Sequence, residues 1–551
     1  MRSKVRAAAF FVGFLTFLVC ASVYLRLFRY VSSSSSASIA AASDYSATLR
    51  RHPHLHLTID DDRAPSASSS PHLHPSAAVL LPDWQALLLL PPDSPPPSPS
   101  PLFCLFSDNS TSSATPAGLL PFSLRHSFLC PLPPSVRRHR PFLTPRLLPS
   151  SDPILEPLDP SPELMRWTSI AYESLSTPDD VIVFAKGVNS RQGVNRRPSD
   201  LLCLFSDGST TAVTTSAQEV FRCPHPSPPP LPDRTVQVSL KILSENRVIP
   251  SVASYRRRPL ARADSSPPPQ KSLLCACTMV YNVAKFLPEW VTYHASIGVD
   301  RFILYDNMSD DDLKGVVDKL KRENHNNITT YRWPWPKTQE AGFSHCLTLH
   351  RDTCHWIAFI DVDEFLFSPA WANSPRPSKS MLGSTLARQG PSIGQVTFGC
   401  DEFGPSDLKA HPMDGVTQGY TCRRSAEQRH KSIVRPGAVD LSLVNVVHHF
   451  KVREGVYKVR RLGRHEGVVK HYKYQAWPEF KAKFRRRVSA YVVDWTQTVN
   501  KDSKDRAPGL GFAPVEPARW ARMFCEVNDT GLRDVTRRWF RVGSGRLAWE
   551  L

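Results

Sequence analysis

The twelve residues 356–367, WIAFIDVDEFLF, constrain the fold of this chain more than any other stretch. Residues 356–360 form a nearly continuous apolar run, which is typical of a strand buried on both faces of a parallel sheet. The run ends abruptly in three acids within four residues, Asp361, Asp363 and Glu364. Because open α/β sheets bind ligands at the carboxyl ends of their strands, these acids are expected to line a site.

Asp361 and Asp363 are two residues apart and therefore point the same way in an extended chain. Two carboxylates on one side can share a divalent cation, and Mg²⁺ or Mn²⁺ takes such oxygens together with substrate phosphates. The alternative is a pair of loop acids that cap the following turn. The same spacing occurs at 60–62 and 310–312, but neither pair ends a buried strand, and we interpret both as solvated acids.

The segment before this strand alternates strand-like and helix-like patterns. Short apolar runs are followed by stretches with helical periodicity, and Gly298 suits the position just after a helix. The order β-α-β-α-β-α-β is typical of a doubly wound α/β sheet. The expected strands are 273–280, 301–305, 327–332 and 356–360, and the expected helices are 284–297, 311–323 and 339–351.

Polar residues follow the first two strands of this pattern. Asn282 comes after the first strand, and Asp306 and Asn307 come after the second. Because parallel strands end at one edge of the sheet, we expect Asn282 and Asp306 to face the same crevice as Asp361. Asp306 would bind a ribose hydroxyl or a base edge, or else serve as a turn residue. The nearby crevice disfavours glycosylation of the sequon at Asn307.

Residues 7–25 are a run of uncharged, mostly apolar residues flanked by basic ones. This length just spans a bilayer, and the slight charge bias favours a cytosolic N-terminus. We therefore expect a cytosolic tail at 1–6, a transmembrane signal-anchor at 7–25 and a disordered stalk at 26–79, rich in Ser, Ala, Pro and His. A cleaved signal peptide is the alternative, and either would deliver most of the chain into the secretory lumen.

An internal repeat follows a Pro-rich region. Residues 104–111, CLFSDNST, match residues 203–210, CLFSDGST, and each unit closes with an aromatic residue, one further residue, and Cys-Pro. Each unit indicates a strand, a turn and a second strand whose two cysteines could be bridged, although four cysteines allow three connectivities. We expect a β-rich domain at 80–250, acting as a carbohydrate-binding module or as a structural collar, and a linker at 251–270.

The net charge of +18 favours anionic partners such as phosphate, acidic polysaccharide or a membrane surface. Nucleic acid is not expected, because the sequence has no zinc-finger spacing, basic zipper or RNA-binding signature. Eleven of the 12 cysteines lie outside 7–25, and this odd number leaves at least one free or paired between chains. Cys400 and Cys422 flank a loop that a disulfide could hold. Candidate glycosylation sequons are at Asn109, Asn307, Asn327 and Asn528.

Four motifs in a fixed order add to this interpretation. They are CTMVYN at 277–282, FLPEW at 286–290 with YH at 293–294, FILYDN at 302–307, and FIDVDEF at 359–365. The ordered string resembles glycosyltransferase family 92 over roughly residues 270–500, and within it the plant galactan β-1,4-galactosyltransferases. The resemblance implies a GT-A catalytic domain, Rossmann-like, at 271–540, preceded by the β-rich module and anchored in the Golgi membrane as a single-pass type II protein.

The resemblance also implies an activity, namely metal-dependent, inverting transfer from a UDP-sugar. The expected donor is UDP-galactose, and the expected acceptor is a growing β-1,4-galactan side chain of pectin. A homodimer is an open option. The alternatives are a lumenal carbohydrate-binding scaffold with an inactive transferase domain, and a family member that uses another donor such as UDP-arabinopyranose.

Metal ligands follow from the same resemblance. Asp361 and Asp363 match the family's DxD acids and would bind Mn²⁺ or Mg²⁺. His471 belongs to a His-Tyr segment that matches the family's C-terminal part and continues to Lys483, and it is the candidate third ligand. The adjacent residues His448 and His449 are its rivals.

Substrate contacts are expected from four residues. Gln339 matches the family's helix before the DxD strand and would bind substrate. Lys431, Arg435 and Lys451 would contact the pyrophosphate. Residues 451–487 hold thirteen Lys or Arg against three Glu, which indicates a groove for phosphate and acidic pectin or, alternatively, a solvated basic face.

A catalytic base must lie within about 3 Å of the acceptor hydroxyl. Asp401 and Glu402 follow an expected strand at 394–398, which is a suitable place, and the sequence does not decide between them. Glu427 and Glu364 are further candidates.

Overall fold

The computed structural model describes residues 75–92, 94–96, 100–149, 161–189, 194–227, 235–256, 270–323, 327–446, 448–483, 515–543 and 545–550. These residues belong to one compact unit that begins at Pro71. The predicted cytosolic tail, the signal-anchor at 7–25 and nearly all of the stalk lie outside the described ranges. Within those ranges, no helix combines the length and the apolar character that a membrane crossing requires.

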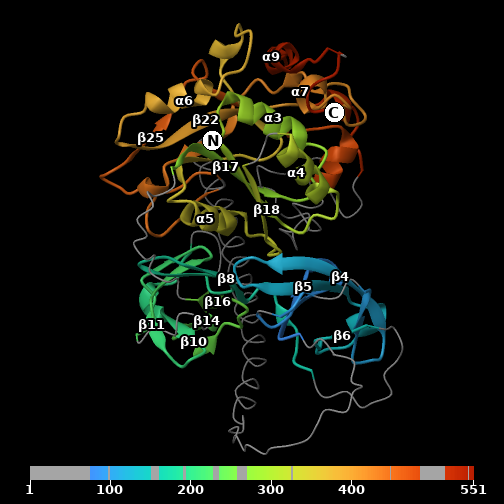
Figure 1. Cartoon of the computed structure of the whole chain (residues 1–551), viewed down its shortest axis with the longest axis vertical. Coiled ribbons are helices and arrows are strands. Elements are labelled where there is room, and N and C mark those ends of the chain that lie inside the picture. Colours follow the sequence, from blue (N-terminus) through green and yellow to red (C-terminus); the bar gives the residue numbers. More distant parts are fainter. Residues whose placement is uncertain are drawn as a thin grey trace, which may run out of the picture. The chain divides into compact units, whose positions relative to one another are not determined.

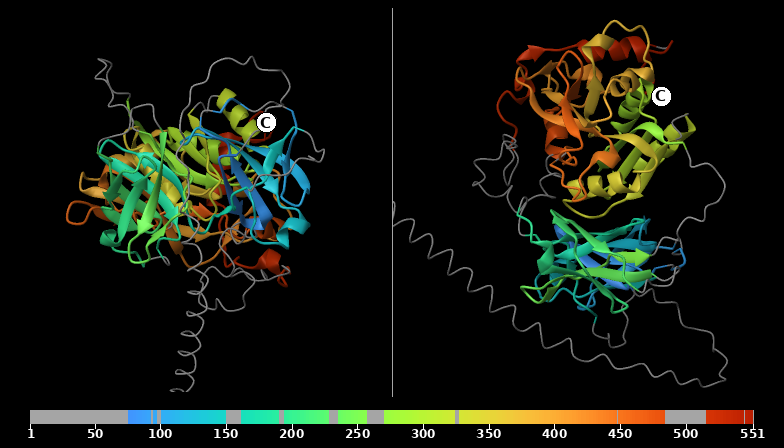
Figure 2. Two further views of the ribbon diagram at one scale, coloured as in Figure 1. Left: turned by 90° about the horizontal axis from the view of Figure 1, so that it is seen from below. Right: turned by 90° about the vertical axis from the view of Figure 1, so that its left-hand side faces the viewer.

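The first part of the described chain is built almost entirely of strands, as the sequence predicts for 80–250. The strands form sheets of seven, five and four members, and Figures 1 and 2 show β4–β6 (blue to cyan) beside β10, β11 and β14 (green). The strands are β1 (Ala77–Leu81), β2 (Gln85–Leu89), β3 (Leu102–Leu105), β4 (Thr111–Leu120), β5 (Arg125–Pro131), β6 (Arg146–Leu148), β7 (Met165–Arg166), β8 (Ile170–Ser176), β9 (Asp180–Lys186), β10 (Leu201–Phe205), β11 (Thr210–Ala212), β12 (Thr215–Ala217), β13 (Val220–Pro224), β14 (Thr235–Ile242), β15 (Arg247–Val248) and β16 (Ser254–Arg256).

The two copies of the repeat have the same local structure. In each, an aspartate after the first strand accepts the N–H of the serine two residues on, at 3.0 Å for Asp108 and 2.9 Å for Asp207. Each copy also holds a disulfide, Cys104–Cys130 between β3 and β5 and Cys203–Cys223 between β10 and β13. The predicted bridge within each unit is therefore confirmed.

The second part contains a nine-stranded mixed sheet. The strand order is β19-β18-β17-β20-β24-β22-β26-β21, with β25 beside β22, and β19, β18, β17 and β20 are parallel. Figure 1 shows these elements in green to red. Their bounds are β17 (Ser272–Val280), α3 (Leu287–Ile297), β18 (Arg301–Asp306), α4 (Leu313–Arg322), β19 (Ile328–Arg332), α5 (Gln339–Leu349), β20 (Cys354–Phe359), β21 (Glu364–Phe367), α6 (Ser380–Ala387), β22 (Ile393–Glu402), α7 (Val416–Gly419), β23 (Cys422–Arg423), β24 (Gln428–Val434), β25 (Lys458–Arg461), β26 (Val468–His471), β27 (Val527–Asn528) and α9 (Gly531–Phe540).

The predicted β-α-β-α-β-α-β order is confirmed, with small differences at helix starts. Helix α3 begins three residues later than expected, with Pro288 in its first turn, where proline's missing N–H costs nothing. Helix α4 begins after Asp312, whose carboxylate accepts the N–H of Gly315 (3.2 Å) as an N-cap. Gly298 follows α3 with a φ of +120°, a conformation that favours glycine.

The two faces of the parallel strands have different partners, because successive strand residues point to opposite sides. On one face, Leu274 and Ala276 of β17 pack in a core with α3 and α4. On the other face, Cys275 and Cys277 pack with α5, and disulfides join them to Cys354 and Cys346. The strand is therefore buried on both faces, which explains its continuous apolar sequence.

The β-rich part extends the core on the α5 face. Val79 of β1 and Phe184 of β9 belong to the same buried cluster as Cys275 and Trp333. Polar contacts add to this packing. They are Lys186 Nζ to the Lys337 carbonyl (3.1 Å), Gln218 Nε2 to the Asn445 carbonyl (2.7 Å) and Arg222 to the Leu441 carbonyl (2.9 Å). The contacted loops precede Gln339 and His448, so the β-rich part supports the loops that carry them.

Strand β22 extends through Glu402, whereas the sequence analysis places Asp401 and Glu402 after a strand that ends at Phe398. Strand β26 lies between β21 and β22, and its residue His471 pairs with Glu364 on one side and with Glu402 on the other. The preceding residue, Lys470, pairs with Phe365 and Asp401. Paired residues point to the same face, so Glu402 and Asp401 point to opposite faces of the sheet.

The proposed disulfide between Cys400 and Cys422 is wrong. Cys422 lies in β23 and is bonded to Cys525, which precedes the paired strand β27. Cys400 lies within β22, and its side chain is buried in the core on the face that α3 covers. Among the eleven described cysteines Cys400 is the free one, which agrees with the expectation from an odd count.

Candidate active site

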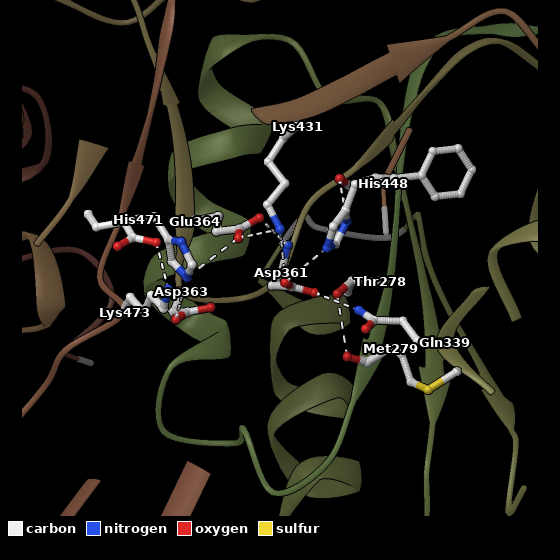
Figure 3. A network of polar contacts seen from close by, with 12 residues as sticks. Thr278, Met279, Gln339, Asp361, Asp363, Glu364, Lys431, His448, His471 and Lys473 are labelled. Carbon is white, nitrogen blue, oxygen red and sulfur yellow. Dashed lines mark hydrogen bonds and ion pairs between the residues drawn. The ribbon is translucent and has the colours of Figure 1, made fainter. Parts of the chain in front are cut away.

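The segment after β20 is a tight turn, residues 361–364, that carries three acids. The N–H of Glu364 donates to the carbonyl of Asp361 (3.0 Å), and the N–H of Asp361 donates to the Glu364 carboxylate (2.9 Å). The carbonyl of Asp363 accepts the N–H of Tyr472, just after β26 (2.9 Å). These bonds fix the acids relative to β20, β21 and β26, and Figure 3 shows Asp361, Asp363 and Glu364 close together.

Asp361 contacts side chains from three separate segments. Gln339 Nε2, at the start of α5, donates to Oδ1 (3.1 Å), and Lys431 Nζ, from β24, donates to Oδ2 (3.2 Å). Nε2 of His448 lies 3.3 Å from the same Oδ2. Burial raises the pKa of Asp361, but Lys431 and His448 outweigh burial and hold the pKa well below 3.8. Asp361 is therefore a carboxylate at neutral pH.

His448 is held between two acceptors. Its Nδ1–H donates to the carbonyl of Phe359 at the end of β20 (2.9 Å), and its Nε2 faces Asp361 Oδ2 (3.3 Å). Burial and Lys431 lower the pKa of His448, which keeps the ring neutral at pH 7. Its backbone has a φ of +70°, a conformation that costs a non-glycine residue about 1–3 kcal/mol. The fold accepts this strain and places the imidazole against Asp361.

Asp363, Glu364 and His471 form a second group beside Asp361. One potential ligand atom from each lies within 4.8 Å of the others, and Nε2 of His471 is 3.4 Å from Asp363 Oδ2 and 3.5 Å from Glu364 Oε1. Figure 3 shows the three side chains converging from the turn and from β26. We call Asp361, Asp363, Glu364 and His471 the acidic cluster.

The acidic cluster holds unequal charges. Burial raises the pKa of Asp363, but Lys483 and His471 outweigh it and hold the pKa well below 3.8. Burial raises the pKa of Glu364 to about 8, with Asp361 and Asp363 acting in the same direction and Lys431 against them. Burial lowers the pKa of His471 to about 4, against the effect of Asp363. His471 is therefore neutral at pH 7 and has a lone pair to offer.

Two lysines contact the cluster from opposite sides. Lys431 lies between Asp361 and Glu364, with its Nζ 2.6 Å from Glu364 Oε1, and Lys483 contacts Asp363. Burial lowers the pKa of Lys431, but Asp361 and Glu364 outweigh burial and raise it, so the ammonium is retained. Both lysines can also donate to an anion that enters the site.

The donor set of the acidic cluster fits a divalent metal ion. Around an octahedral cation with bonds of about 2.1 Å, neighbouring ligand atoms are about 3 Å apart, close to the 3.4 Å and 3.5 Å separations found at His471. Two carboxylate oxygens and one neutral imidazole nitrogen are ligands that Mn²⁺ accepts, and Mg²⁺ accepts the oxygens. Asp363, Glu364 and His471 could thus hold a metal ion.

Comparison with known sequences identifies the family. A family model described as Glycosyltransferase family 92 matches residues 270–506. A family 92 protein of Arabidopsis thaliana is 42% identical over 399 residues, 70% of this chain and 69% of that protein. One of Oryza sativa subsp. japonica is 39% identical over 510 residues, 87% of this chain and 83% of that protein. The chain belongs to glycosyltransferase family 92. The predicted family is confirmed, and membership of a glycosyltransferase family supports a transferase activity.

Solved structures are more distant from this family 92 protein. A mannosyltransferase from Pyrobaculum calidifontis in complex with GDP-Man and Mn²⁺ aligns with a TM-score of 0.27 and 11% identity, over 41% of this chain and 63% of that chain. Glucosyl-3-phosphoglycerate synthase from Mycobacterium tuberculosis aligns with a TM-score of 0.21 and 12% identity, over 42% and 83%. At these scores the identification rests on the family model and the sequence relatives.

The two base candidates of the family 92 domain have different surroundings. Glu402 shares a face of the sheet with His471, and Lys473 Nζ lies 2.7 Å from its carboxylate. Burial raises the pKa of Glu402, but Lys473 outweighs it and lowers the pKa below 4.5. Asp401 points to the other face, where Arg464 (2.5 Å) and Lys470 (3.0 Å) bind it.

A group of ion pairs surrounds Asp401 on that opposite face. Asp529 is 2.6 Å from both Lys470 and Arg423, and Arg423 is 3.6 Å from Asp401. Two acids thus meet three cations on the face of the sheet opposite to that of Glu364 and Glu402. We call this the paired cluster, and it consists of Asp401, Arg423, Arg464, Lys470 and Asp529.

Asn282 and Asp306 lie at the carboxyl ends of β17 and β18, at the edge of the sheet where β20 leads into Asp361. Asp306 accepts the N–H of Ser309 (2.8 Å) and pairs with Arg332. Asn282 accepts the N–H of Asp310 (2.8 Å). These bonds shape the loop at the edge, and both substrate roles remain predictions.

Other expected site residues lie elsewhere. Arg435 stacks over Trp356 of β20 (4.3 Å), and Lys451 is exposed in a loop. His449 contacts His430 (3.0 Å) rather than an acid of the turn. Glu427 pairs with Arg461. Among the expected residues, the structure therefore brings Asp361, Asp363, His471, Gln339 and Lys431 together, with His448 as a sixth.

Two members of the site have roles that the sequence does not show. The sequence marks Glu364 only as a candidate base, because its direction depends on the turn that closes onto Asp361. It marks Lys483 only as the end of the His-Tyr segment, whereas Lys483 contacts Asp363 in the structure. The available signals were three acids in four residues and a lysine within the matching C-terminal segment.

Proposed function

We propose that this family 92 protein transfers galactose from UDP-galactose to a growing β-1,4-galactan side chain of pectin, with inversion at the anomeric carbon. The observation that carries the proposal is the acidic cluster, in which Asp363, Glu364 and His471 offer metal ligands beside two lysines. Galactose as donor sugar and galactan as acceptor derive from the sequence resemblance to plant galactan synthases. Family membership supports the transferase reaction.

In the proposed reaction the site binds the diphosphate of the donor. Asp363, Glu364 and His471 would hold Mn²⁺ or Mg²⁺, and such an ion, when bound, neutralises charge on the departing UDP. Lys431 and Lys483 add fixed positive charge at the same place, where the leaving group acquires its negative charge. Gln339 and His448 keep Asp361 oriented at the edge of this region.

Glu402 is the proposed general base. It shares a face with His471, and its lowered pKa keeps it ionised at neutral pH, so it can accept the proton of the acceptor hydroxyl. Lys473 holds its carboxylate in one orientation (2.7 Å). Asp401 is a poorer candidate because three cations already surround it on the other face.

We also propose that the protein acts in the Golgi lumen as a single-pass type II membrane protein. This proposal rests on the uncharged run at 7–25 and on five disulfides among the described cysteines, which suit an oxidising compartment. Protease protection of a full-length fusion in microsomes tests it, because digestion of the C-terminal part in sealed vesicles would contradict the orientation.

A donor panel tests the enzymatic proposal. The full-length protein is incubated with Mn²⁺, short β-1,4-galacto-oligosaccharides and several UDP-sugars, and UDP release and product linkage are measured. We expect release with UDP-galactose, a β-1,4-linked product and loss of activity with EDTA. Equal UDP release by wild type and Asp363→Ala would contradict the proposal and leave a carbohydrate-binding scaffold. A preference for UDP-arabinopyranose would correct only the donor.

A further inference from the structure

Strand β21 is the last strand of the nine-stranded sheet. It pairs with β26 on one side, where Glu364 lies opposite His471 and Leu366 opposite Val469. In an antiparallel pair every second residue turns its N–H and C=O away from the partner strand. Glu364 and Leu366 do so here, because their outward backbone groups bond elsewhere. The outward N–H and C=O groups of β21, which begins with the candidate metal ligand Glu364, therefore need hydrogen-bond partners that are not in a strand.

Three side chains of α3 satisfy that edge. Trp290 Nε1 donates to the carbonyl of Glu364 (3.0 Å), and the Tyr293 hydroxyl donates to the carbonyl of Leu366 (2.7 Å). The N–H of Leu366 donates to Nε2 of His294 (3.3 Å). Positions 290, 293 and 294 lie on one face of a helix, since they are three and four residues apart. The helix thus presents a row of polar atoms in place of a neighbouring strand.

The bonding pattern fixes the state of His294. Its Nδ1 faces the carbonyl of Trp290 (2.8 Å), which can only accept, so Nδ1 carries the proton and Nε2 is the acceptor for Leu366. Burial lowers the pKa of His294 to about 3, so the ring stays neutral at physiological pH. The imidazole therefore bridges its own helix and β21 in a single defined orientation.

The row of polar atoms is closed to water. Trp290, Tyr293, His294 and Glu364 are all 0% exposed. A buried carbonyl or N–H that loses its partner here has no water to replace it, and such a group is costly. Apolar side chains such as Phe or Leu would fill the same space without these bonds, so shape alone does not account for the three residue types.

We propose that Trp290, Tyr293 and His294 are positioning residues of the transferase site. They fix β21 at Glu364, and Glu364 in turn closes the turn onto Asp361 through two hydrogen bonds (3.0 Å and 2.9 Å). A shift of this strand would move Glu364 and the adjacent Asp363 relative to His471. The inference rests on the proposed metal site, and it explains why Trp, Tyr and His occur in a motif that touches no expected substrate.

Matched variants of the full-length protein test the inference. His294→Leu removes the acceptor for Leu366, whereas His294→Gln keeps an oxygen near the position of Nε2. Tyr293→Phe removes one hydroxyl and nothing else. Ser296→Ala is the control, because Ser296 bonds only within its own helix, to the Thr292 carbonyl (2.8 Å). Binding of Mn²⁺ alone is measured by electron paramagnetic resonance, together with hydrogen exchange of peptides covering 361–371 and the Mn²⁺ dependence of UDP release.

We expect His294→Leu and Tyr293→Phe to weaken Mn²⁺ binding about tenfold, as loss of a group that orients a ligand does, and to speed exchange in 361–371. His294→Gln should restore most of both, and Ser296→Ala should match wild type. Folded variants with wild-type Mn²⁺ binding and wild-type exchange would overturn the inference. Should His294→Leu fail to fold, Tyr293→Phe decides by the same criteria.

Failure of the inference and failure of the proposed function give different results. A wild type that releases UDP from no donor contradicts the proposed function, whereas Mn²⁺ binding and hydrogen exchange still report on the positioning residues. A wild type that is active, together with folded variants that behave like it, contradicts only the inference.

Discussion

The acidic cluster and the paired cluster lie on opposite faces of β26 and differ in their balance of charge. Lys470 points into the paired cluster, and the next residue, His471, points into the acidic cluster. The paired cluster sets two aspartates against three cations. The acidic cluster sets two carboxylates, together with Glu364 whose pKa is raised to about 8, against two lysines and a neutral histidine. Both include one residue of β26, Lys470 in the paired cluster and His471 in the acidic cluster.

The difference shows what marks a functional site in this molecule. Buried ion pairs alone do not, because the paired cluster has them and is neutralised by its own side chains. In the acidic cluster, carboxylates face one another closely enough that burial and the neighbouring aspartates raise the pKa of Glu364 to about 8. A bound divalent cation would favour release of the proton that the raised pKa keeps on Glu364, and this crowding of acids distinguishes the candidate active site.

Replacing Asp363 should have the largest effect on catalysis. Asp363→Asn removes a charge from the acidic cluster and keeps the shape, so we expect UDP release to fall about a thousandfold. The melting temperature should stay near that of wild type, because one repulsion among carboxylates is lost together with the contact to Lys483. Steady-state UDP release and calorimetry measure the two quantities. If Asp363→Asn is strongly destabilised but its folded fraction keeps the wild-type rate, the two clusters do not differ in function as proposed.

Replacing Asp401 should have the opposite signature. Asp401→Asn breaks a buried, fully paired group, and we expect a loss of about 3 kcal/mol in the free energy of unfolding, measured in urea. The rate of UDP release per folded molecule should remain close to wild type. Asp318→Asn is the control, since it breaks an exposed pair with Lys314 (2.9 Å) on α4 and should change neither quantity. A large loss of rate without a loss of stability would instead indicate that Asp401 takes part in catalysis.

Replacing Glu402 separates two acids that are adjacent in sequence. Glu402→Gln removes the proposed base, so the rate should fall about a hundredfold. Binding of Mn²⁺ should be retained, since Glu402 does not belong to the proposed ligand set, while the melting temperature should fall because the buried pair with Lys473 is broken. The comparison with Asp401→Asn under identical conditions is the test. Equal rates for the two variants would exclude Glu402 as the base.

The smallest expected effect concerns acid stability. Burial raises the pKa of Asp529, but Lys470 and Arg423 outweigh it and lower the pKa below 3.8. A depressed folded-state pKa contributes stability above the ordinary value of 3.8, and this contribution is lost as pH falls through the folded pKa. The melting temperature of Asp529→Asn should therefore fall less steeply than that of wild type below pH 4. Parallel curves would show that Asp529 is not held by its cations.

The parallel half of the sheet could be predicted from sequence because its signals are local. Strands β17, β18 and β20 are short, largely apolar runs, Asp312 marks the start of α4, and Asp361 and Asp363 stand at the end of the last run. Asp361 and Asp363 follow the end of β20 whatever the pairing register of the neighbouring strands, so their place at the edge of the sheet can be predicted without that register. Their partners Gln339 and Lys431 came from the family resemblance and the basic composition.

The mixed half could not be predicted to the same depth, because its arrangement depends on distant pairing. Asp401 and Glu402 differ only in the face to which they point, and that depends on β22 continuing through Glu402 beside β26. A shift of one residue in register exchanges the two faces. The same limit applies to Cys422, whose partner Cys525 is 103 residues away.

The β-rich part shares a buried core with α5, so the folded unit begins before the region that the family model matches. The family model begins at residue 270, whereas Tyr172 and Phe184 pack against Trp333, which is fully buried. A protein shortened to the family boundary would expose Trp333 and Trp335 to solvent. A chimera that joins the β-rich part of one relative to the family 92 domain of another would need residues that still pack around Trp333. We therefore expect the sequences of the two regions to change together during evolution.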